Sequence, residues 1–202
     1  ISSNKKDKIN IFNFIEGRHI KQIEKKHLNL CLDFLKKINK NTNYKNFRFQ
    51  KASDSCLSIF EHIQSCSTRI KKFIKIYQKK KNIYDKKIYN FLIKKIQPSF
   101  KKVIKEINQN FTTYQKKNRI KESHMILSPS DFGFHNILIS KNKTIFIDFE
   151  YAGWDDPNKL LCDFILNPDY SISNTNQFYF LKKFSKIFKN KFSLSKKFHI
   201  LK

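Results

Sequence analysis

The segment 127–157 reads LSPSDFGFHNILISKNKTIFIDFEYAGWDDP and carries the most specific patterns in the chain. Two short β-type runs, 136–140 and 144–149, flank Lys-Asn-Lys, a pattern typical of a hairpin. Asp156 followed by Pro157 predicts a helix start, because a carboxylate caps the first turn and proline fits within it. Two of the chain's three glycines, Gly133 and Gly153, lie here. In a chain so poor in glycine, they indicate backbone positions that tolerate little else.

Three polar side chains in this segment have the spacing of a phosphoryl-transfer site. Asn136 follows Asp131 by five positions, and Asp148 follows Asn136 by twelve, at the end of the second predicted strand. Phosphoryl transfer needs a carboxylate that deprotonates the attacking hydroxyl and hard oxygen ligands that hold Mg²⁺. We therefore predict Asp131 as the catalytic base and Asn136 and Asp148 as metal ligands. The alternative is a loop that only caps a strand, since Asp and Asn are common in turns.

The segment also resembles the aminoglycoside phosphotransferase and choline kinase group, small-molecule kinases that share the protein-kinase fold. Residues 130–136 (SDFGFHN) match the catalytic loop, and residues 147–151 (IDFEY) match the metal-binding segment. The resemblance implies ATP and Mg²⁺ as cofactors. It also implies that Phe14 and Ile15 belong to the connector between two lobes, whose backbone contacts adenine. The chain departs from the family pattern at Pro129, where such loops commonly carry histidine.

The resemblance implies an α+β fold, namely the mostly helical C-terminal lobe of a protein-kinase-like fold with a small catalytic β-hairpin. The expected organisation is one phosphotransferase lobe over 1–202, with a hinge strand at 1–17, a helical part at 18–120, the catalytic hairpin and following helix at 121–167, and a C-terminal helical part at 168–202. The nucleotide-covering N-terminal lobe is expected upstream of residue 1. The isolated fragment is accordingly expected to be inactive.

The spacing of apolar residues predicts the elements around this segment. Alternation over 8–16 predicts a strand that runs into a turn at Gly17, and helical spacing predicts a helix over 19–40. A second helix is expected to start at Ser53 or Asp54 and to reach about residue 80. A third should cover 84–110, with a kink or break at Pro98. The helix after Asp156 should reach about 166, and another should cover 178–192.

Composition explains the high charge without a nucleic-acid partner. The net charge is +26, yet only four of the 42 basic residues are arginine. Lys, Ile, Phe and Asn make up 107 of the 202 residues, as a genome drifting to high A+T would produce. Proteins that read nucleic acids favour arginine for its planar fork. We therefore expect no specific nucleic-acid partner, although a basic nucleic-acid-associated protein remains an alternative.

Other function classes are limited by what the sequence lacks. Three glycines cannot form a Rossmann fingerprint or a P-loop. No apolar run approaches the ~18 residues that span a bilayer, so no membrane partner is expected. The four cysteines contain no C-x-x-C pair, and they are expected to be buried free thiols in a reducing cytoplasm rather than zinc ligands. A cytoplasmic location is expected.

Together with the spacing of Asp131, Asn136 and Asp148, the resemblance implies an ATP-dependent phosphotransferase that moves a γ-phosphoryl group to a hydroxyl of a small molecule. A catalytically dead pseudokinase-like binding module is a further alternative. Trp154 either stacks on a substrate or packs in the core, and core packing is favoured. Asp155 and Asp156 lie where a cationic acceptor could be held, although capping accounts for Asp156. Asp163 could brace the catalytic loop. His124 and His135 have no partner in the sequence and are interpreted as structural or solvated.

Overall fold

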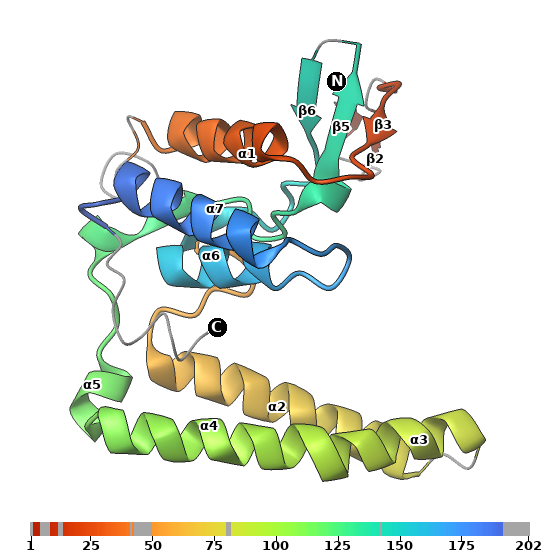
Figure 1. Cartoon of the computed structure of the whole chain (residues 1–202), viewed down its shortest axis with the longest axis vertical. Coiled ribbons are helices and arrows are strands. Elements are labelled where there is room, and N and C mark those ends of the chain that lie inside the picture. Colours follow the sequence, from red (N-terminus) through yellow and green to blue (C-terminus); the bar gives the residue numbers. More distant parts are fainter. Residues whose placement is uncertain are drawn as a thin grey trace.

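Helices dominate the described part of the chain, accompanied by small antiparallel sheets (Figure 1). The computed structural model describes residues 2–4, 9–11, 14–40, 42, 50–79, 82–141 and 143–191. The helices are α1 (Lys25–Ile38), α2 (Ile59–Gln78), α3 (Ile83–Phe91), the π-helical turn η1 (Leu92–Ile96), α4 (Gln97–Asn110), α5 (Thr113–Lys117), the 3₁₀ turns η2 (Glu122–His124) and η3 (Phe134–Asn136), α6 (Pro157–Ile165) and α7 (Asn174–Ile187). The strands are β1 (Ser2–Asn4), β2 (Ile9–Ile11), β3 (Arg18–His19), β4 (Ile126–Ser128), β5 (Ile137–Ser140), β6 (Lys143–Phe146) and β7 (Gly153–Asp155). This mixture confirms the α+β class.

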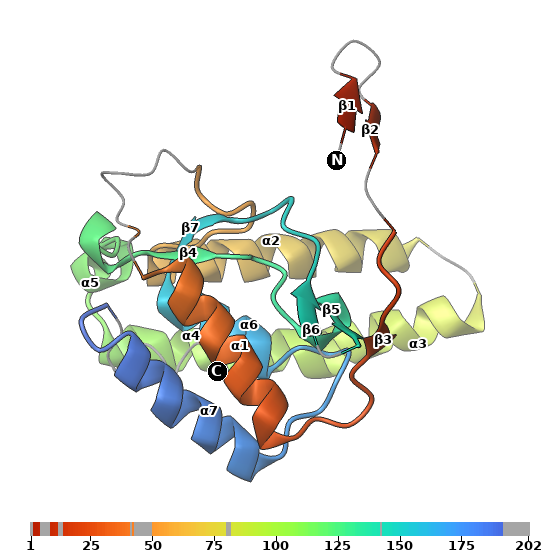
Figure 2. The same cartoon turned by 90° about the horizontal axis from the view of Figure 1, so that it is seen from above.

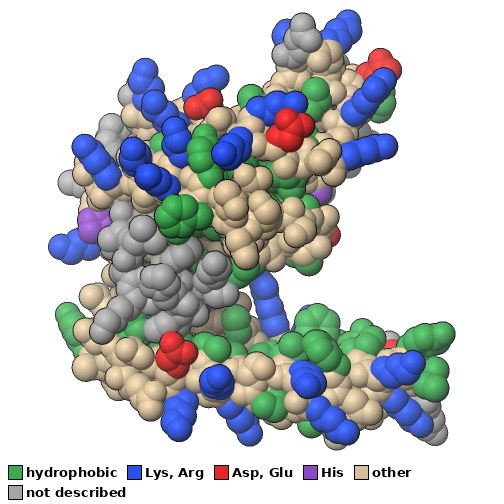
Figure 3. Space-filling view, viewed as in Figure 1, with side chains coloured by type: hydrophobic (Ala, Val, Ile, Leu, Met, Phe, Trp, Pro, Cys, Tyr) green, Lys and Arg blue, Asp and Glu red, His purple; other side chains and the backbone are tan. Residues whose placement is uncertain are grey.

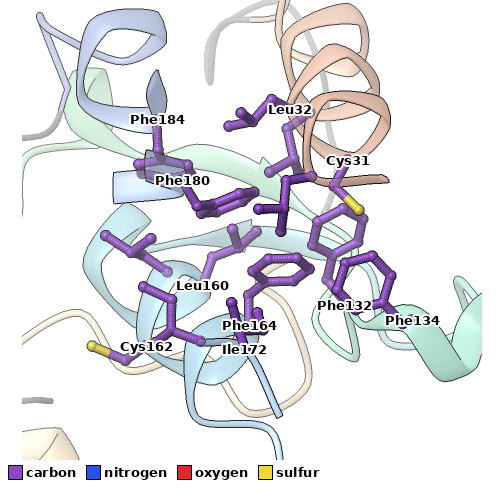
Figure 4. Close-up of a cluster of buried hydrophobic side chains, with 14 of the residues drawn as sticks. Cys31, Leu32, Phe132, Phe134, Leu160, Cys162, Phe164, Ile172, Phe180 and Phe184 are labelled. Carbon is purple, nitrogen blue, oxygen red and sulfur yellow. The ribbon is translucent and has the colours of Figure 1, made fainter. Parts of the chain in front are cut away.

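The main hydrophobic core lies between α1, α6 and α7 and reaches into the loop after β4 (Figure 4). Phe164 of α6 stacks on Phe180 of α7, with ring centroids 4.4 Å apart, and on Phe132, with centroids 5.4 Å apart. Phe134 packs on the same Phe164 ring. Because Phe132 and Phe134 are buried on either side of Gly133, the core holds the loop that carries the predicted site.

Helices α2, α3 and α4, with η1 between the last two, form an arm set apart from the rest of the molecule (Figure 1). The helical path continues through Pro98, and the irregularity expected there lies just before it, where the π turn η1 separates α3 from α4. Pro98 lacks an N–H, and its ring would clash with the carbonyl of residue 94 in a regular α-helix. The π turn immediately before it widens the helix, and the Gln97 N–H bonds to the Leu92 carbonyl.

Two helices begin later than the sequence predicted. Helix α1 starts at Lys25 rather than at 19, because Arg18 and His19 pair with β5 as a strand. Helix α2 is capped by Ser58, whose hydroxyl accepts the Glu61 N–H at 3.2 Å, and not by residues 53 or 54. The backbone at 52–53 bonds instead to residues 154 and 151. In both cases a pairing with a distant segment takes the backbone groups that a longer helix would need.

The predicted hairpin is confirmed. Strands β5 and β6 pair from Ile137↔Phe146 to Ser140↔Lys143, and β3 pairs with the other edge of β5 (Figure 2). Strand β6 ends at Phe146, so Asp148 lies two residues beyond the strand rather than within it. The strand expected over 8–16 is observed only as β2, which pairs with β1, and residues 14–17 are not a strand.

A second pair of strands, β4 and β7, brings residues 126–128 against 153–155. Trp154 is fully buried there with Leu57 and Met125, which confirms the core interpretation of the tryptophan. Helix α6 follows directly, with the Asp156 side chain accepting the Asn158 N–H at 2.8 Å as the predicted cap. Helix α7 begins at Asn174, earlier than expected, behind a Ser173 cap.

Cys31, Cys56 and Cys162 are buried free thiols, as expected, but Cys66 on α2 is exposed. Within the described ranges, no helix combines the length and the apolar character needed to cross a bilayer.

Candidate functional site

Asp131 lies in a tight loop directly after β4. The Ser128 hydroxyl accepts the Ser130 N–H at 3.0 Å, and the Pro129 carbonyl accepts the Asp131 N–H at 3.1 Å. Ser130 adopts a left-handed backbone with φ of 69°. A non-glycine residue in this region costs free energy and often marks a functional loop. These bonds order the loop that follows Pro129.

His135 contacts Asp131, which the sequence analysis missed. Its Nε2 lies 3.1 Å from Asp131 Oδ1, and its Nδ1 lies 3.6 Å from Asp169 Oδ2. The interpretation of His135 as a residue without a partner is therefore wrong. Gly133 was the available signal, because a Cβ there would lie 2.7 Å from the His135 ring. The glycine leaves space for an imidazole that orients the predicted base.

Asn136 is bound to the same loop. Its Nδ2 donates to the Asp131 backbone carbonyl at 2.9 Å and approaches Asp131 Oδ2 at 3.4 Å. With the amide nitrogen engaged in this way, the amide oxygen is the atom that remains for a cation. The structure thus brings Asp131 and Asn136 together.

Asp148 is placed beside Asn136 by the hairpin. Ile147 donates its N–H to the Asn136 carbonyl at 3.1 Å. Asp148 therefore directly follows the residue that is bonded to Asn136. Its backbone is left-handed, with φ of 64°, a conformation that aspartate tolerates better than most residues. At Asp148 the backbone no longer follows the extended path of β6. The Asp148 side chain is exposed.

A hydrogen bond to the Glu150 carboxylate, together with the charge of that carboxylate, raises the pKa of the Tyr151 hydroxyl above its ordinary value, and desolvation and the charges of Asp148 and Asp131 add smaller effects. In the described part of the chain, no three His, Cys, Asp or Glu side chains gather closely enough to hold a metal by themselves. Any cation here would depend on Asn136 and on oxygens from a ligand.

A cleft of about 790 Å³ opens beside Asp131, between the arm and the α6 side of the molecule. Its described lining from the arm comes from α2 and α4, whereas Ser130, Asp131 and Tyr151 come from the loops that carry the predicted site. The volume lies within the range of ordinary small-molecule sites, ~300–1,000 Å³. A small molecule bound in the cleft can thus reach the Asp131 carboxylate.

Phe14 and Ile15, the predicted adenine-contacting residues, lie in the extended segment before β3. Phe14 is 93% exposed and Ile15 is 38% exposed. The β3–β5 pairing ties this segment to the sheet that contains the hairpin, and Gly17 packs against Leu138 of β5. The two residues are attached to the sheet that presents Asp148 but do not line the cleft beside Asp131.

Asp155 and Asp156 are not available to a ligand. They are 1% and 0% exposed, so the idea that they hold a cationic acceptor is wrong. Asp155 Oδ1 accepts the Asp156 N–H at 2.8 Å, and Oδ2 lies 3.8 Å from Lys159 Nζ. Burial raises the pKa of Asp155 to about 7, although Lys159 and the N–H bond act against the shift. Asp163, considered as a brace for the catalytic loop, instead forms a hydrogen-bonded ion pair with Lys159.

The buried Asp155 carboxyl predicts a pH-dependent stability. Its folded pKa of about 7 exceeds the ordinary value of 3.8, so the folded state holds an extra proton between these pH values. The free energy of unfolding should therefore fall as pH rises through this window, by up to ~1.4 kcal/mol per unit. Asp155→Asn keeps the acceptor oxygen and removes the titration. Urea unfolding should be measured at pH 5 and pH 8. The free energy of unfolding of the variant relative to the wild type should be higher at pH 8 than at pH 5, and an equal difference at both pH values would contradict the raised pKa of Asp155.

No protein-family model and no curated protein sequence matches the chain. Among solved structures, the choline kinase of Cryptosporidium parvum Iowa II is similar, with a TM-score of 0.47 and 17% sequence identity. The similarity covers 93% of this chain and 57% of that one, so the chain spans little more than half the length of that kinase.

Proposed function

We propose that the chain is the acceptor-binding and catalytic part of an ATP-dependent phosphotransferase that acts on a hydroxyl of a small molecule. The observation that carries the proposal is the position of Asp131. Its carboxylate is oriented by His135 and Asn136 and borders a cleft large enough for a small molecule. A carboxylate held at a cleft in this way suits the deprotonation of an acceptor hydroxyl.

The residues assigned to Mg²⁺ fit that ion by their chemistry. Asn136 and Asp148 offer an amide oxygen and a carboxylate, both hard ligands, on the two sides of one hairpin. Mg²⁺ is usually bound by one or two carboxylates together with substrate phosphates, so a small protein ligand set is sufficient. The bound ion would neutralise phosphate charge. Ser130 and Asp148 are two of the three non-glycine residues with positive φ in the described ranges, the third being Lys141 in the hairpin turn, and strained backbone of this kind supports a functional role for both loops.

The roles of the protein groups follow from these positions. Asp131 would accept the proton of the acceptor hydroxyl as the hydroxyl oxygen attacks the γ-phosphorus, the bond from that phosphorus to the β,γ-bridging oxygen breaks, and ADP leaves. His135 would hold Asp131 Oδ1, and Oδ2, which accepts one long hydrogen bond from Asn136 Nδ2, would use its remaining lone pair for the acceptor hydroxyl. Phe14 and Ile15 would contribute backbone to the adenine edge, as the resemblance implies.

The test is phosphoryl transfer by the longest gene product that contains these residues. The protein is incubated with ATP, with and without Mg²⁺, and with a panel of sugars, polyols and amino alcohols, and phosphate esters are followed by ³¹P NMR. The expected result is Mg²⁺-dependent formation of one ester class. ATP binding without ester formation would favour the binding-module alternative. Neither ATP binding nor ester formation would contradict the proposal.

A further inference from the structure

The two walls of the cleft differ in chemistry. The arm contributes Ile59 and Ile63 from α2 and Phe100, Val103 and Ile107 from α4, together with the α2 residues His62, Ser65, Cys66 and Arg69. The opposite wall is more polar, with Ser130, Asp131, Lys159, Asp163 and Asn167 beside Cys162, Leu166 and Pro168. A ligand that fills this cleft therefore meets apolar side chains on one side and the predicted base on the other.

The apolar wall continues along α2 beyond the cleft. Residues seven apart lie within about 20° of one another around an α-helix. Phe73 and Ile76 therefore share the face of the cleft-lining Cys66 and Arg69. They are 49% and 40% exposed, although they are large and apolar. We call Ile59, Ile63, Phe73, Ile76, Phe100 and Val103 the apolar track.

Part of the track is exposed, because Phe73, Ile76 and Val103 are 38–49% exposed, whereas Ile59 is buried. Figure 3 shows hydrophobic side chains along the edge of the arm that faces the gap below the rest of the molecule, while lysines and arginines gather on the opposite edge. From Cys66 to Ile76 the helix rises about 15 Å, at ~1.5 Å per residue. An exposed apolar strip of this kind, continuous with a small-molecule cleft, indicates a binding surface.

The charges in the cleft disfavour an anionic head group, because three carboxylates (Asp54, Asp131 and Asp163) line it. Arg69 pairs with Asp54 at 2.9 Å, and Lys159 pairs with Asp163. These are the cations among the described lining residues, and each already has a carboxylate partner. An anionic ligand would have to displace one of these pairs, whereas a hydroxyl group can bond to Asp131 without doing so.

We propose that the acceptor is an amphiphilic alcohol, with a hydroxyl-bearing head that carries no negative charge at Asp131 and a hydrocarbon part along the apolar track. The proposal rests on the phosphotransferase function and names its substrate class. The apolar part supplies binding energy in proportion to the area it buries. The polar wall then fixes which hydroxyl meets the base.

The experiment measures binding of n-hexyl, n-heptyl and n-octyl β-D-glucoside, below their micelle concentrations, to the 202-residue chain by isothermal titration calorimetry. A nonionic head avoids non-specific attraction to a chain of net charge +26. The dissociation constant should fall about two- to fourfold with each added methylene. Methyl β-D-glucoside should bind at least tenfold more weakly than the octyl compound.

Two variants locate the binding. Phe73→Glu and Val103→Glu change residues that are 49% and 38% exposed, so neither opens the core, and each should weaken octyl glucoside binding at least tenfold. Phe178→Glu is the matched control, because Phe178 is 67% exposed on α7 and does not line the cleft. Equal losses in all three variants, or no dependence on chain length, would overturn the inference.

The outcomes separate this inference from the proposed function. Phosphorylation of polar acceptors with no effect of alkyl length would leave the phosphotransferase in place and refute the amphiphilic acceptor. Chain-length-dependent binding at the apolar track without phosphoryl transfer by the longest gene product would support the binding surface and contradict the enzyme. If the track instead covers a second copy of the chain, Phe73→Glu would change the oligomeric state in sedimentation analysis and leave glucoside binding unaltered, which would also refute the inference.

Discussion

Replacing Asp131 with asparagine is expected to lower kcat for phosphoryl transfer by about 10³-fold and to leave nucleotide affinity unchanged. A positioned general base contributes ~10²–10⁴-fold to a rate. The asparagine side chain keeps the size of aspartate and can still contact His135 and Asn136, so the loop should keep its shape. The readouts are steady-state turnover and ATP affinity, in the longest gene product that shows activity.

Asp33→Asn serves as the matched control for this prediction. It makes the same chemical change on the exposed face of α1, outside the residues that line the cleft. Its turnover should equal that of the wild type. If Asp131→Asn also retains full turnover, Asp131 is not the base. If both variants lose activity equally, the loss reflects a general effect of removing a negative charge.

Replacing Gly153 with alanine should destabilise the fold by about 3 kcal/mol, near the upper end of the usual cost of overpacking. A Cβ at this position would lie 2.4 Å from the Gln50 carbonyl oxygen and 2.5 Å from the Ala52 nitrogen. Both atoms belong to backbone that is bonded to Trp154, at 2.9 Å and 3.0 Å. The backbone therefore cannot retreat without breaking the bonds that hold residues 50–52 on β7. Urea unfolding followed by circular dichroism measures the loss.

Gly17→Ala is the comparison for Gly153→Ala. Its Cβ would meet the Leu138 Cβ at 3.0 Å and the Ile139 carbonyl oxygen at 3.4 Å, which is tight contact rather than overlap. Gly→Ala changes without a clash commonly stabilise a protein by reducing the freedom of the unfolded chain. A loss at 153 well above that at 17 is expected. Equal effects would show that the close approach at β7 does not limit the residue at 153.

Much of the site could be predicted from the sequence because it depends on interactions between residues that are close in the chain. The hairpin follows from two β-type runs and a three-residue polar connection, and the Asp156 cap follows from a carboxylate next to proline. The two glycines of the 127–157 segment marked close approaches, and the structure shows a clash for a Cβ at each. Such features are set by interactions within a few residues, so the local pattern is sufficient to predict them.

Helix starts were less predictable, because backbone pairing with distant strands competes with helix propensity. The apolar spacing over 19–40 is helical. Residues 18 and 19 nevertheless pair with Ile139 and Leu138 of the hairpin, about 120 positions away in the sequence. The cap of α2 moved to Ser58 because residues 52 and 53 bond to the backbone of residues 154 and 151. Propensity is a weak prior that tertiary pairing overrides.

By itself, the sequence determined the hairpin, the capped helix that follows it and the positions of Asp131, Asn136 and Asp148 along the chain. Only the tertiary structure decided that His135 bonds to Asp131, that Asp155 is buried and that the arm faces the α6 side across a cleft. The physical reason is the separation along the chain of the residues that interact. Turns and caps form between neighbouring residues, whereas burial and cleft geometry depend on how packing brings together segments that lie far apart in the chain.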